Sequence, residues 1–330
     1  RFIIPAMAGV FYNIGIILGT VLLSPSLGLW GPVAGVALGA LLFAAIQVPL
    51  MVRLGYRHTL EVNPHVAGVK EVARLMGPRT LGLAISQIDI TVDLMLASLL
   101  GARMVTIFNF AQHLQQLPVG LFGTTIAQAA LPSLSQLSAK EDKNEFVTTM
   151  QDAMHQILFW VLPASMLFAV LRVPMVRLVF GASRFDWSAT VDTSLTLSAF
   201  SISLFAQALI HILARGFYAL HDSRTPVGVG IATVLLNSVM SVLFIQLFHL
   251  PIWSLGLSTS IASIINALIL LILLERRIPG IISSKLLVPA FTMVIAAGAT
   301  GVALWVPLKL LDQLVFDTTR TFGLILLTGI

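Results

Sequence analysis

Apolar residues fill most of the chain in long runs, and short polar stretches separate one run from the next. A run of about 20 apolar residues is long enough to cross a membrane as an α-helix. The pattern therefore predicts nine membrane-spanning helices and the beginning of a tenth, at residues 2–22, 30–52, 79–100, 104–134, 154–180, 192–219, 227–248, 252–274 and 286–308, with the last one after 321.

Breaks in the pattern subdivide these spans. The turn at Gly101-Ala102-Arg103 separates the third span from the fourth. Pro118 and Pro163 fall inside the long fourth and fifth spans, which are expected either to tilt or to break there. Between the second and third spans, residues 66–76 place apolar side chains on one helical face and charged ones on the others, which predicts an amphipathic helix at the membrane surface.

The composition supports this interpretation. Of the 330 residues, 57% are hydrophobic and only 10% are charged, with a mean hydropathy of +0.96. Soluble domains carry about 25% charged residues, so the chain is expected to be an all-α polytopic membrane protein. It contains no cysteine, which excludes disulfides, thiolate metal sites and cysteine nucleophiles.

The basic residues predict the orientation of the spans. Thirteen Lys and Arg residues fall on one side, at Arg1 and in the loops near 53–79, 140–143, 215–224 and 276–285, against six near 103, 172–184 and 309–320. Loops rich in Lys and Arg usually stay in the cytoplasm, so the first side is expected to face it. The net charge of +5 is then explained by these loops and by anionic lipid, with no nucleic-acid partner expected.

A weak internal repeat divides the chain. Segments that begin at Arg1 and Arg224 resemble each other, as do those that begin at Trp30 and Trp253, and the alternative is chance similarity between apolar sequences. A parallel repeat is expected where two lobes face each other across a central path. It predicts the end of an N-terminal lobe and a cytoplasmic linker at 1–78, a six-helix C-terminal lobe at 79–275, and additional, truncated helices at 276–330.

Polar residues follow one face of the fourth span. Asn109, Gln112, His113 and Gln116 are spaced at i, i+3, i+4 and i+7. Polar groups at membrane depth usually face the interior of the bundle or water, so these four residues are the candidate substrate-binding surface. The alternative for His113 is a neutral histidine that is hydrogen-bonded in the core.

Two carboxylates lie in the third span, at Asp89 and Asp93. A carboxylate in the membrane needs a cation, a proton or a basic partner, and Asp93 is the deeper of the two. Neutral oxygens of Asn237, Ser241 and Thr259 would complete a site that suits Na⁺ as well as a proton. The alternatives are a protonated Asp93, and polar residues that only hold helices together.

The sequence offers no candidate for catalysis. Metalloprotease, hydrolase, P-loop and dinucleotide-binding motifs are absent, as is any Cys/His cluster with metal-ligand spacing. We therefore expect no enzyme activity, and no cofactor or metal beyond a coupled Na⁺ or proton. Asp222 and Arg224 precede Pro226 at a turn between helices, where Asp can cap the next helix and Pro suits its first turn, with gating as the alternative role.

Two longer motifs resemble a known family. Gln116-Leu-Pro-Val-Gly-Leu-Phe-Gly123, which contains Pro118 and Gly120, and Ala214-Arg-Gly-Phe-Tyr-Ala219, which leads to Asp222-Ser-Arg-Thr-Pro226, are similar to signatures of the MurJ (MviN) family of lipid II flippases. The resemblance implies the fold of the MOP exporter superfamily, with two six-helix lobes in parallel repeat. It also implies a fragment that lacks the first four helices of the family.

One position departs from the family pattern. Where the family usually has Tyr-Ala-Asp-Arg-Leu, with the Arg linked to the pyrophosphate of the lipid, this chain has Phe110-Ala-Gln-His-Leu114. Histidine carries charge only when it is protonated. Phosphate binding is therefore expected to be weaker or dependent on pH.

The resemblance implies a function. It implies that the protein moves lipid II, an undecaprenyl-pyrophosphate-linked disaccharide-peptide, across the bacterial cytoplasmic membrane by alternating access. Lipid II, membrane lipid and the cell-wall synthesis machinery are then the expected partners. The alternatives are a related exporter of polysaccharide-lipids, drugs or cations, a non-transporting membrane scaffold of the cell-wall or division machinery, and an integral-membrane enzyme.

Overall fold

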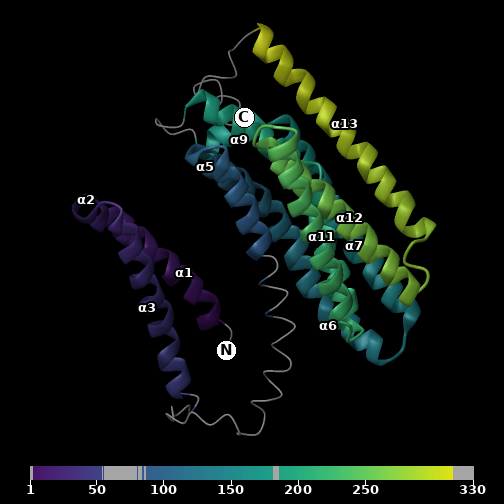
Figure 1. Ribbon diagram of the computed structural model, residues 1–330. Helices are drawn as coiled ribbons and strands as arrows, with labels where there is room; N and C mark the ends of the chain where they lie inside the picture. The colour runs from purple at the N-terminus through teal and green to yellow at the C-terminus, as the bar shows by residue number, and fades with distance from the viewer. Residues whose placement is uncertain are drawn as a thin grey trace. The chain divides into compact units, whose positions relative to one another are not determined.

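The computed structural model describes residues 3–53, 55, 80, 84, 87–180 and 186–314, and every element in these ranges is a helix (Figure 1). The chain divides into two compact units, Arg1–Lys70 and Glu71–Ile330. Each unit is described by itself below.

The first unit is a helical hairpin. It consists of α1 (Ile3–Leu18), the π-helix η1 (Gly19–Leu23), the single turn α2 (Ser24–Leu27) and the long helix α3 (Trp30–Arg53). Gly28 reverses the chain between the two arms with a φ of 57°, a conformation that glycine adopts without strain. The helices α1 and α3 then pack along each other.

Glycine lets the two arms of the hairpin touch backbone to backbone. A Cβ atom on Gly35 would lie 2.9 Å from the Cα of Gly19, and one on Gly15 would overlap the backbone of Gly39. Small residues spaced four apart allow membrane helices to approach this closely and to gain van der Waals contact. The glycine positions therefore fix both the distance and the register between α1 and α3.

The second unit is a helical bundle. After the helical residues 87–99 come α5 (Ala102–Pro118), the π-helix η2 (Val119–Thr124), α6 (Thr125–Ala139), α7 (Lys143–Val170), α8 (Arg172–Phe180), α9 (Trp187–Ser201), α10 (Leu204–Ala219), α11 (Arg224–Val242), the π-helix η3 (Leu243–Leu247), α12 (Trp253–Arg277) and α13 (Ser284–Leu314). The central helix α10 packs against α6, α7 and α12, while α11 packs on α12 and α13 runs along α7.

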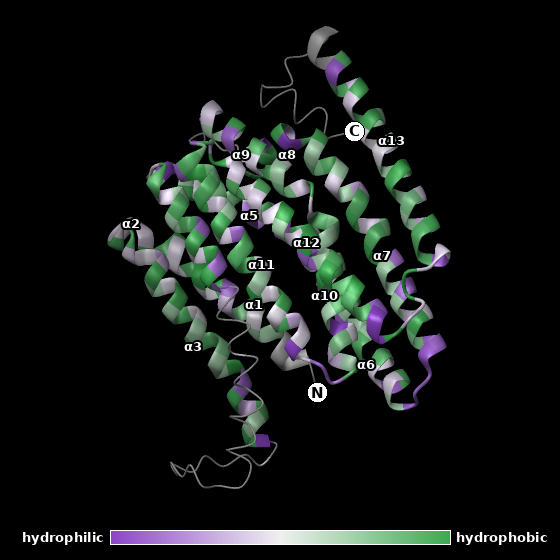
Figure 2. Cartoon of the chain, turned by 45° about the vertical axis from the view of Figure 1, so that its right-hand side comes forward, coloured by the Kyte–Doolittle hydropathy of each residue, from purple (hydrophilic) through white to green (hydrophobic). Residues whose placement is uncertain are grey.

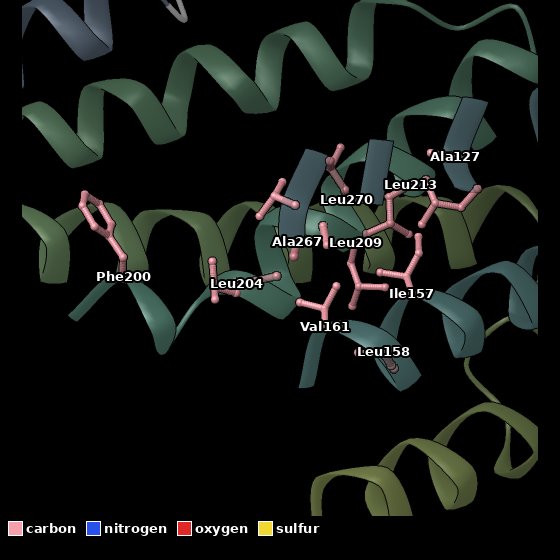
Figure 3. Close-up of a cluster of buried hydrophobic side chains, with 14 of the residues drawn as sticks. Ala127, Ile157, Leu158, Val161, Phe200, Leu204, Leu209, Leu213, Ala267 and Leu270 are labelled. Carbon is pink, nitrogen blue, oxygen red and sulfur yellow. The ribbon is translucent and has the colours of Figure 1, made fainter. Parts of the chain in front are cut away.

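A single apolar core holds this bundle together (Figure 3). Phe200 and Leu204 flank the break between α9 and α10, and Ile157 and Val161 of α7 belong to the same buried cluster. All four side chains are fully buried. Burial of one large apolar side chain contributes about 1.5–3 kcal/mol relative to exposure to water, so this cluster fixes the positions of α7, α9 and α10.

The helices match the predicted membrane spans. Among the described residues, seven helices are long and apolar enough to cross a membrane, and the bent pair α9–α10 makes an eighth candidate. Hydrophilic residues gather mainly near the ends of the helices in Figure 2, as expected for a multi-pass protein. The predicted third span, at 79–100, is described at residues 80 and 84 and continuously from 87, and the tenth span and the amphipathic helix at 66–76 lie outside the described residues.

Two of the predicted breaks have different outcomes. At Pro118 the α-helix does end and passes into η2, whereas α7 continues unbroken through Pro163 and ends at Val170. For Pro163 the sequence left two alternatives, a tilted span or a break, and the break was wrong. The sixth span is bent by 46° between Ser201 and Leu204. No proline lies in this span, so the sequence pattern did not predict the bend.

Polar contacts mark the two ends of the second unit. At one end, Arg103 at the start of α5 pairs with Asp186 at 2.6 Å. Asp186 also caps α9 by accepting from the Ala189 amide, and that hydrogen bond, together with Arg103, lowers the pKa of its carboxyl. At the other end, Arg277 of α12 reaches Asp222 in the turn before α11 at 3.3 Å. The predicted cytoplasmic and outer positions therefore fall at opposite ends of the bundle.

Candidate functional site

Four predicted residues meet at one buried point of the second unit. Asp93 accepts hydrogen bonds from Ser241 at 3.0 Å and from Asn237 at 3.3 Å, and the Thr259 hydroxyl lies 3.5 Å from its second oxygen. Asp93 is 3% exposed and Asn237 is 2% exposed. The helical residues 87–99, α11 and α12 thus contribute side chains to one cluster, called the carboxylate cluster below.

Asp89 belongs to the same cluster, although the sequence favoured Asp93 alone. The Asn237 amide nitrogen donates to Asp89 at 2.9 Å as well as to Asp93, so one amide connects both carboxylates. The i, i+4 spacing of the two acids was the signal for this, because it puts them on one helical face. Ser258 of α12 was also missed, and its hydroxyl lies 2.7 Å from that of Ser241.

The carboxylate cluster has no basic partner among the described residues. In the part of the chain that the structure describes, ion pairs involve Asp186 and Asp222 but neither acid of the cluster. Two neighbouring carboxylates repel each other when both are ionised. The Asn237 side-chain oxygen is buried and receives no hydrogen bond from any residue that the structure describes. A set of carboxylate and neutral oxygens with a spare acceptor suits a hard monovalent cation or a proton.

The predicted substrate stripe lies on the open face of α5. His113 and Gln116 are exposed, while Asn109 and Gln112 are partly exposed. Asn109 donates only to the carbonyl of Val105 in its own helix, at 3.0 Å. Within the described ranges, the other three have no hydrogen-bond partner, so the four polar side chains are open to a ligand or to water.

The neighbouring Gln115 points the other way, into the bundle. It is 2% exposed, and its side-chain oxygen accepts from Gln207 of α10 at 3.0 Å. Gln207 also donates to Ser203 at 2.9 Å. Gln207 lies one helical turn after Ser203, but the sequence pattern gave no sign that Gln115 is its partner.

The family motif around Pro118 forms an irregular segment. Pro118 is buried at the end of α5, and η2 follows with Gly120 and Gly123. A Cβ atom on Gly123 would lie 2.8 Å from the Cα of Ala208, whereas one on Gly120 would meet nothing within 4 Å. π-Helical turns inside α-helices often occur at functional sites. Here the motif brings η2 into direct backbone contact with α10.

The motif at residues 222–226 forms the cap of α11. One Asp222 oxygen accepts from the backbone amides of Arg224 and Thr225, both at 3.1 Å, and the other accepts from the Thr225 hydroxyl at 2.8 Å. Partial burial raises the pKa of Asp222, but these hydrogen bonds, with Arg277, outweigh it and hold the pKa below its usual value. Pro226 is buried in the first turn. The contacts support the capping role, and gating stays a prediction.

A cavity of about 400 Å³ opens beside this turn. Its lining comes from the α6–α7 turn, the end of α10 and the end of α12, and includes Glu141, Lys143, Phe217 and Arg277. Three acidic residues, Glu141, Asp142 and Asp222, line it against two basic ones, Lys143 and Arg277, so the lining has a slight acidic excess. For the described residues, no group of three acidic or histidine side chains could hold a metal ion.

Comparison with known proteins identifies relatives of this chain. Residues 1–319 match the family model for lipid II flippase MurJ. The chain is 30% identical over 272 residues to a probable lipid II flippase MurJ of Vibrio cholerae, a match that covers 82% of this chain and 51% of that protein. It is 28% identical over 284 residues to the lipid II flippase MurJ of Burkholderia cenocepacia, covering 84% and 54%. The chain thus spans little more than half the length of these relatives.

Two solved structures share its fold. A lipid II flippase MurJ in an inward closed conformation superposes with a TM-score of 0.71 at 23% identity, covering 94% of this chain and 68% of that one. A MOP superfamily transporter from Pyrococcus furiosus, described as having a binding pocket of reverse polarity, gives 0.62 at 16% identity, covering 84% and 63%. The predicted fold class is confirmed: the chain is an all-α membrane protein with the fold of a MOP superfamily transporter.

Proposed function

This chain belongs to the MurJ family of lipid II flippases, and we propose that it moves lipid II across the bacterial cytoplasmic membrane, in which it is a multi-pass protein. The observation that carries the proposal is the match to the family model over residues 1–319. The substrate is an undecaprenyl-pyrophosphate-linked disaccharide-peptide. Its transfer makes and breaks no covalent bond, so the residues involved bind and release rather than catalyse.

The open face of α5 supports this proposal. Gln112, His113 and Gln116 present hydrogen-bonding groups without partners among the described residues, and Asn109 bonds only to the Val105 carbonyl of its own helix. A polar headgroup needs such groups when it leaves water for the membrane interior, because an unsatisfied polar group in hydrocarbon costs several kcal/mol. We assign the headgroup of lipid II to this stripe.

Alternating access completes the mechanism. Two lobes related by a parallel repeat would rock about the bound headgroup and open the binding surface first to the cytoplasm and then to the outside. The carboxylate cluster supplies the energetic link, since a bound Na⁺ or proton would hold three helices together and favour one state. Cell-wall synthesis enzymes would deliver lipid II to this protein, and that machinery would therefore be a partner.

The proposal is tested by depletion of the full-length protein in its own host. Lipid II should then accumulate in the inner leaflet and become inaccessible to an externally added probe, and expression of the protein should restore access. Unchanged outward exposure of lipid II, in a host without a redundant flippase, would contradict the proposal.

A related exporter is the second candidate, and His113 favours it. A neutral imidazole lacks the permanent positive charge that a pyrophosphate would attract. A lipid-linked saccharide with less charge would suit the same stripe. Competition decides between the two: lipid II should displace a fluorescent lipid II from the purified protein, whereas uncharged lipid-linked saccharides should not.

A further inference from the structure

Three consecutive hydroxyl residues of α12 reach two different parts of the second unit. Ser258 contacts Ser241, and Thr259 faces Asp93, so both belong to the carboxylate cluster. Successive residues of an α-helix point about 100° apart, which places Ser260 on the opposite side of α12 from Ser258. Ser258 and Ser260 are both fully buried.

Ser260 binds the break between α9 and α10. Its hydroxyl donates to the backbone carbonyl of Ala199 at 2.7 Å and lies 2.9 Å from the Ser203 hydroxyl. At this break the Ser203 amide bonds to Phe200 three residues back, instead of to Ala199. The Ala199 carbonyl therefore receives its hydrogen bond from another helix, and α12 holds the bend in place.

From this break the contacts continue to α5. The Gln207 amide donates to Ser203 at 2.9 Å and to the buried Gln115 at 3.0 Å. Gln115 is adjacent in sequence to Gln116, the last residue of the exposed stripe. A continuous set of buried and partly buried polar contacts thus leads from the opposite side of α12 to the helix that carries the candidate substrate-binding residues.

We infer that α12 transmits the state of the carboxylate cluster to α5 through Ser260, Ser203, Gln207 and Gln115. The inference rests on the proposed function, whose ion and substrate sites it connects. Ser260 and Gln207 are positioning residues, because they act through other groups and touch neither ion nor substrate. A buried polar group that loses its hydrogen-bond partner is left unsatisfied, which costs free energy. If α12 shifts at the cluster, α10 and α5 are therefore expected to shift with it, because this keeps their hydrogen bonds intact.

Cysteine accessibility tests the inference without transport. Because the chain contains no cysteine, Gln116→Cys introduces a single thiol on the exposed stripe. The rate at which a polar maleimide modifies it, in the purified full chain, reports how open the stripe is. Asp93→Asn changes the charge of the cluster, and we expect it to alter this rate about twofold or more, the range found for residues of one hydrogen-bond network.

Asp93→Asn is then made in variants that lack one hydrogen-bonding side chain of this set of contacts. In the Gln207→Leu or Ser260→Ala background, Asp93→Asn should leave the modification rate unchanged. Asn266→Leu is the matched control, because Asn266 also lies on α12 and donates to Thr233 at 3.0 Å but contacts neither end of the connection. In that background the effect of Asp93→Asn should persist. A merely structural role of Gln207 would lower stability without removing this dependence.

Three outcomes would overturn the inference. They are a persistent effect of Asp93→Asn in Gln207→Leu, an equal loss in Asn266→Leu, and the absence of any effect in the parent. If Asp93→Asn does not fold, Ser241→Ala replaces it, since Ser241 holds both Asp93 and Ser258. Failure of the parent protein, with Gln116 intact, to transport lipid II would count against the proposed function alone, if the Gln116→Cys chain still shows the coupled accessibility.

Discussion

His113 is exposed on α5 and stands where the family resemblance expects an arginine. We predict that His113→Ala lowers the affinity for lipid II about tenfold, because a hydrogen bond to a charged group contributes about 1.5 kcal/mol or more. His113→Arg should retain binding and flatten its dependence on pH, since Arg carries a permanent charge whereas His carries charge only when it is protonated. Binding of lipid II to each variant is measured in mildly acidic and in mildly alkaline buffer.

The outcome for alanine decides the role of this side chain. If His113→Ala binds and transports as well as the parent at every pH, the imidazole takes no part in headgroup binding and only contributes to the surface of α5.

Asp93 is the residue at which a coupled cation would be detected. We predict that Na⁺ raises the Tm of the purified protein relative to K⁺ or choline, and that Asp93→Asn removes this rise. A ligand at 100 times its Kd stabilises the folded state by about 2.7 kcal/mol. The absence of Na⁺-specific stabilisation in the parent, or its survival in Asp93→Asn, would exclude the Na⁺ site and leave a proton as the candidate.

Asp222 gives a prediction about stability and pH. Asp222→Asn should destabilise the protein by about 0.5–1 kcal/mol at pH 7, because asparagine still caps the helix but lacks the negative charge near the N-terminus of α11 and beside Arg277. Because the folded-state pKa of Asp222 lies below its ordinary value, the stabilisation is complete above about pH 4 and is lost as the pH falls through the folded pKa. The Tm difference between parent and variant should therefore shrink in acid, and a constant difference would argue against the charge as its cause.

Individual residues differ in how far the sequence could predict their roles. Asp93 could be identified because a carboxylate in an apolar run needs a partner, and hydroxyl and amide residues in other apolar runs supplied candidates. The role of Gln115 could not be predicted, because Gln112, His113 and Gln116 surround it in the sequence. Only the packing of α5 on the bundle decides which glutamine turns inward. The ion and substrate roles of the predicted residues stay predictions.

At the scale of single elements, η2 offers a matched pair of glycines. Gly123→Ala should cost about 1–3 kcal/mol, the usual range for overpacking, because its Cβ would press on the backbone of α10. Gly120→Ala should be neutral or stabilising by up to about 1 kcal/mol, since the added methyl meets nothing within 4 Å and removes backbone freedom. The Tm of both variants is compared with that of the parent. Equal effects of the two substitutions would show that the contact with Ala208 is unimportant.

Helix breaks illustrate the limit of sequence patterns for elements. The chain contains proline at both 118 and 163, yet only the first ends its α-helix. The bend between α9 and α10 occurs without proline, at a point where Ser260 of α12 binds the freed carbonyl. A bend that depends on a hydrogen bond from a helix about 60 residues away leaves no local signal. The spans themselves were predictable, because their length and apolarity are local properties.

For the whole molecule, the orientation in the membrane can be tested directly. Ser188 is exposed near the ion pair of Arg103 and Asp186, and Ser223 is exposed in the turn before α11 at the opposite end. We predict that in intact cells an impermeant maleimide labels Ser188→Cys, whereas Ser223→Cys is labelled only after permeabilisation. The reverse result would invert the topology predicted from the basic loops.

The order of elements also repeats along the molecule. In the first unit, α1 passes into η1 and is followed by the long helix α3; in the second, α11 passes into η3 and is followed by α12. Each π-helix thus lies near the end of the first arm of a helical pair. This agreement supports the weak sequence repeat and its common origin in two related halves.

The backbone contact between α1 and α3 has a consequence for the gene. All glycine codons begin with two guanines, and a missense change at either base introduces a residue with a side chain. At Gly15, Gly19 and Gly35 even the smallest, alanine, would strike the facing helix. At these codons only the synonymous third-base changes are expected to be tolerated, and no missense neighbour is. Random mutagenesis of the hairpin should return loss-of-function alleles at these positions, and second-site suppressors should fall elsewhere in the chain.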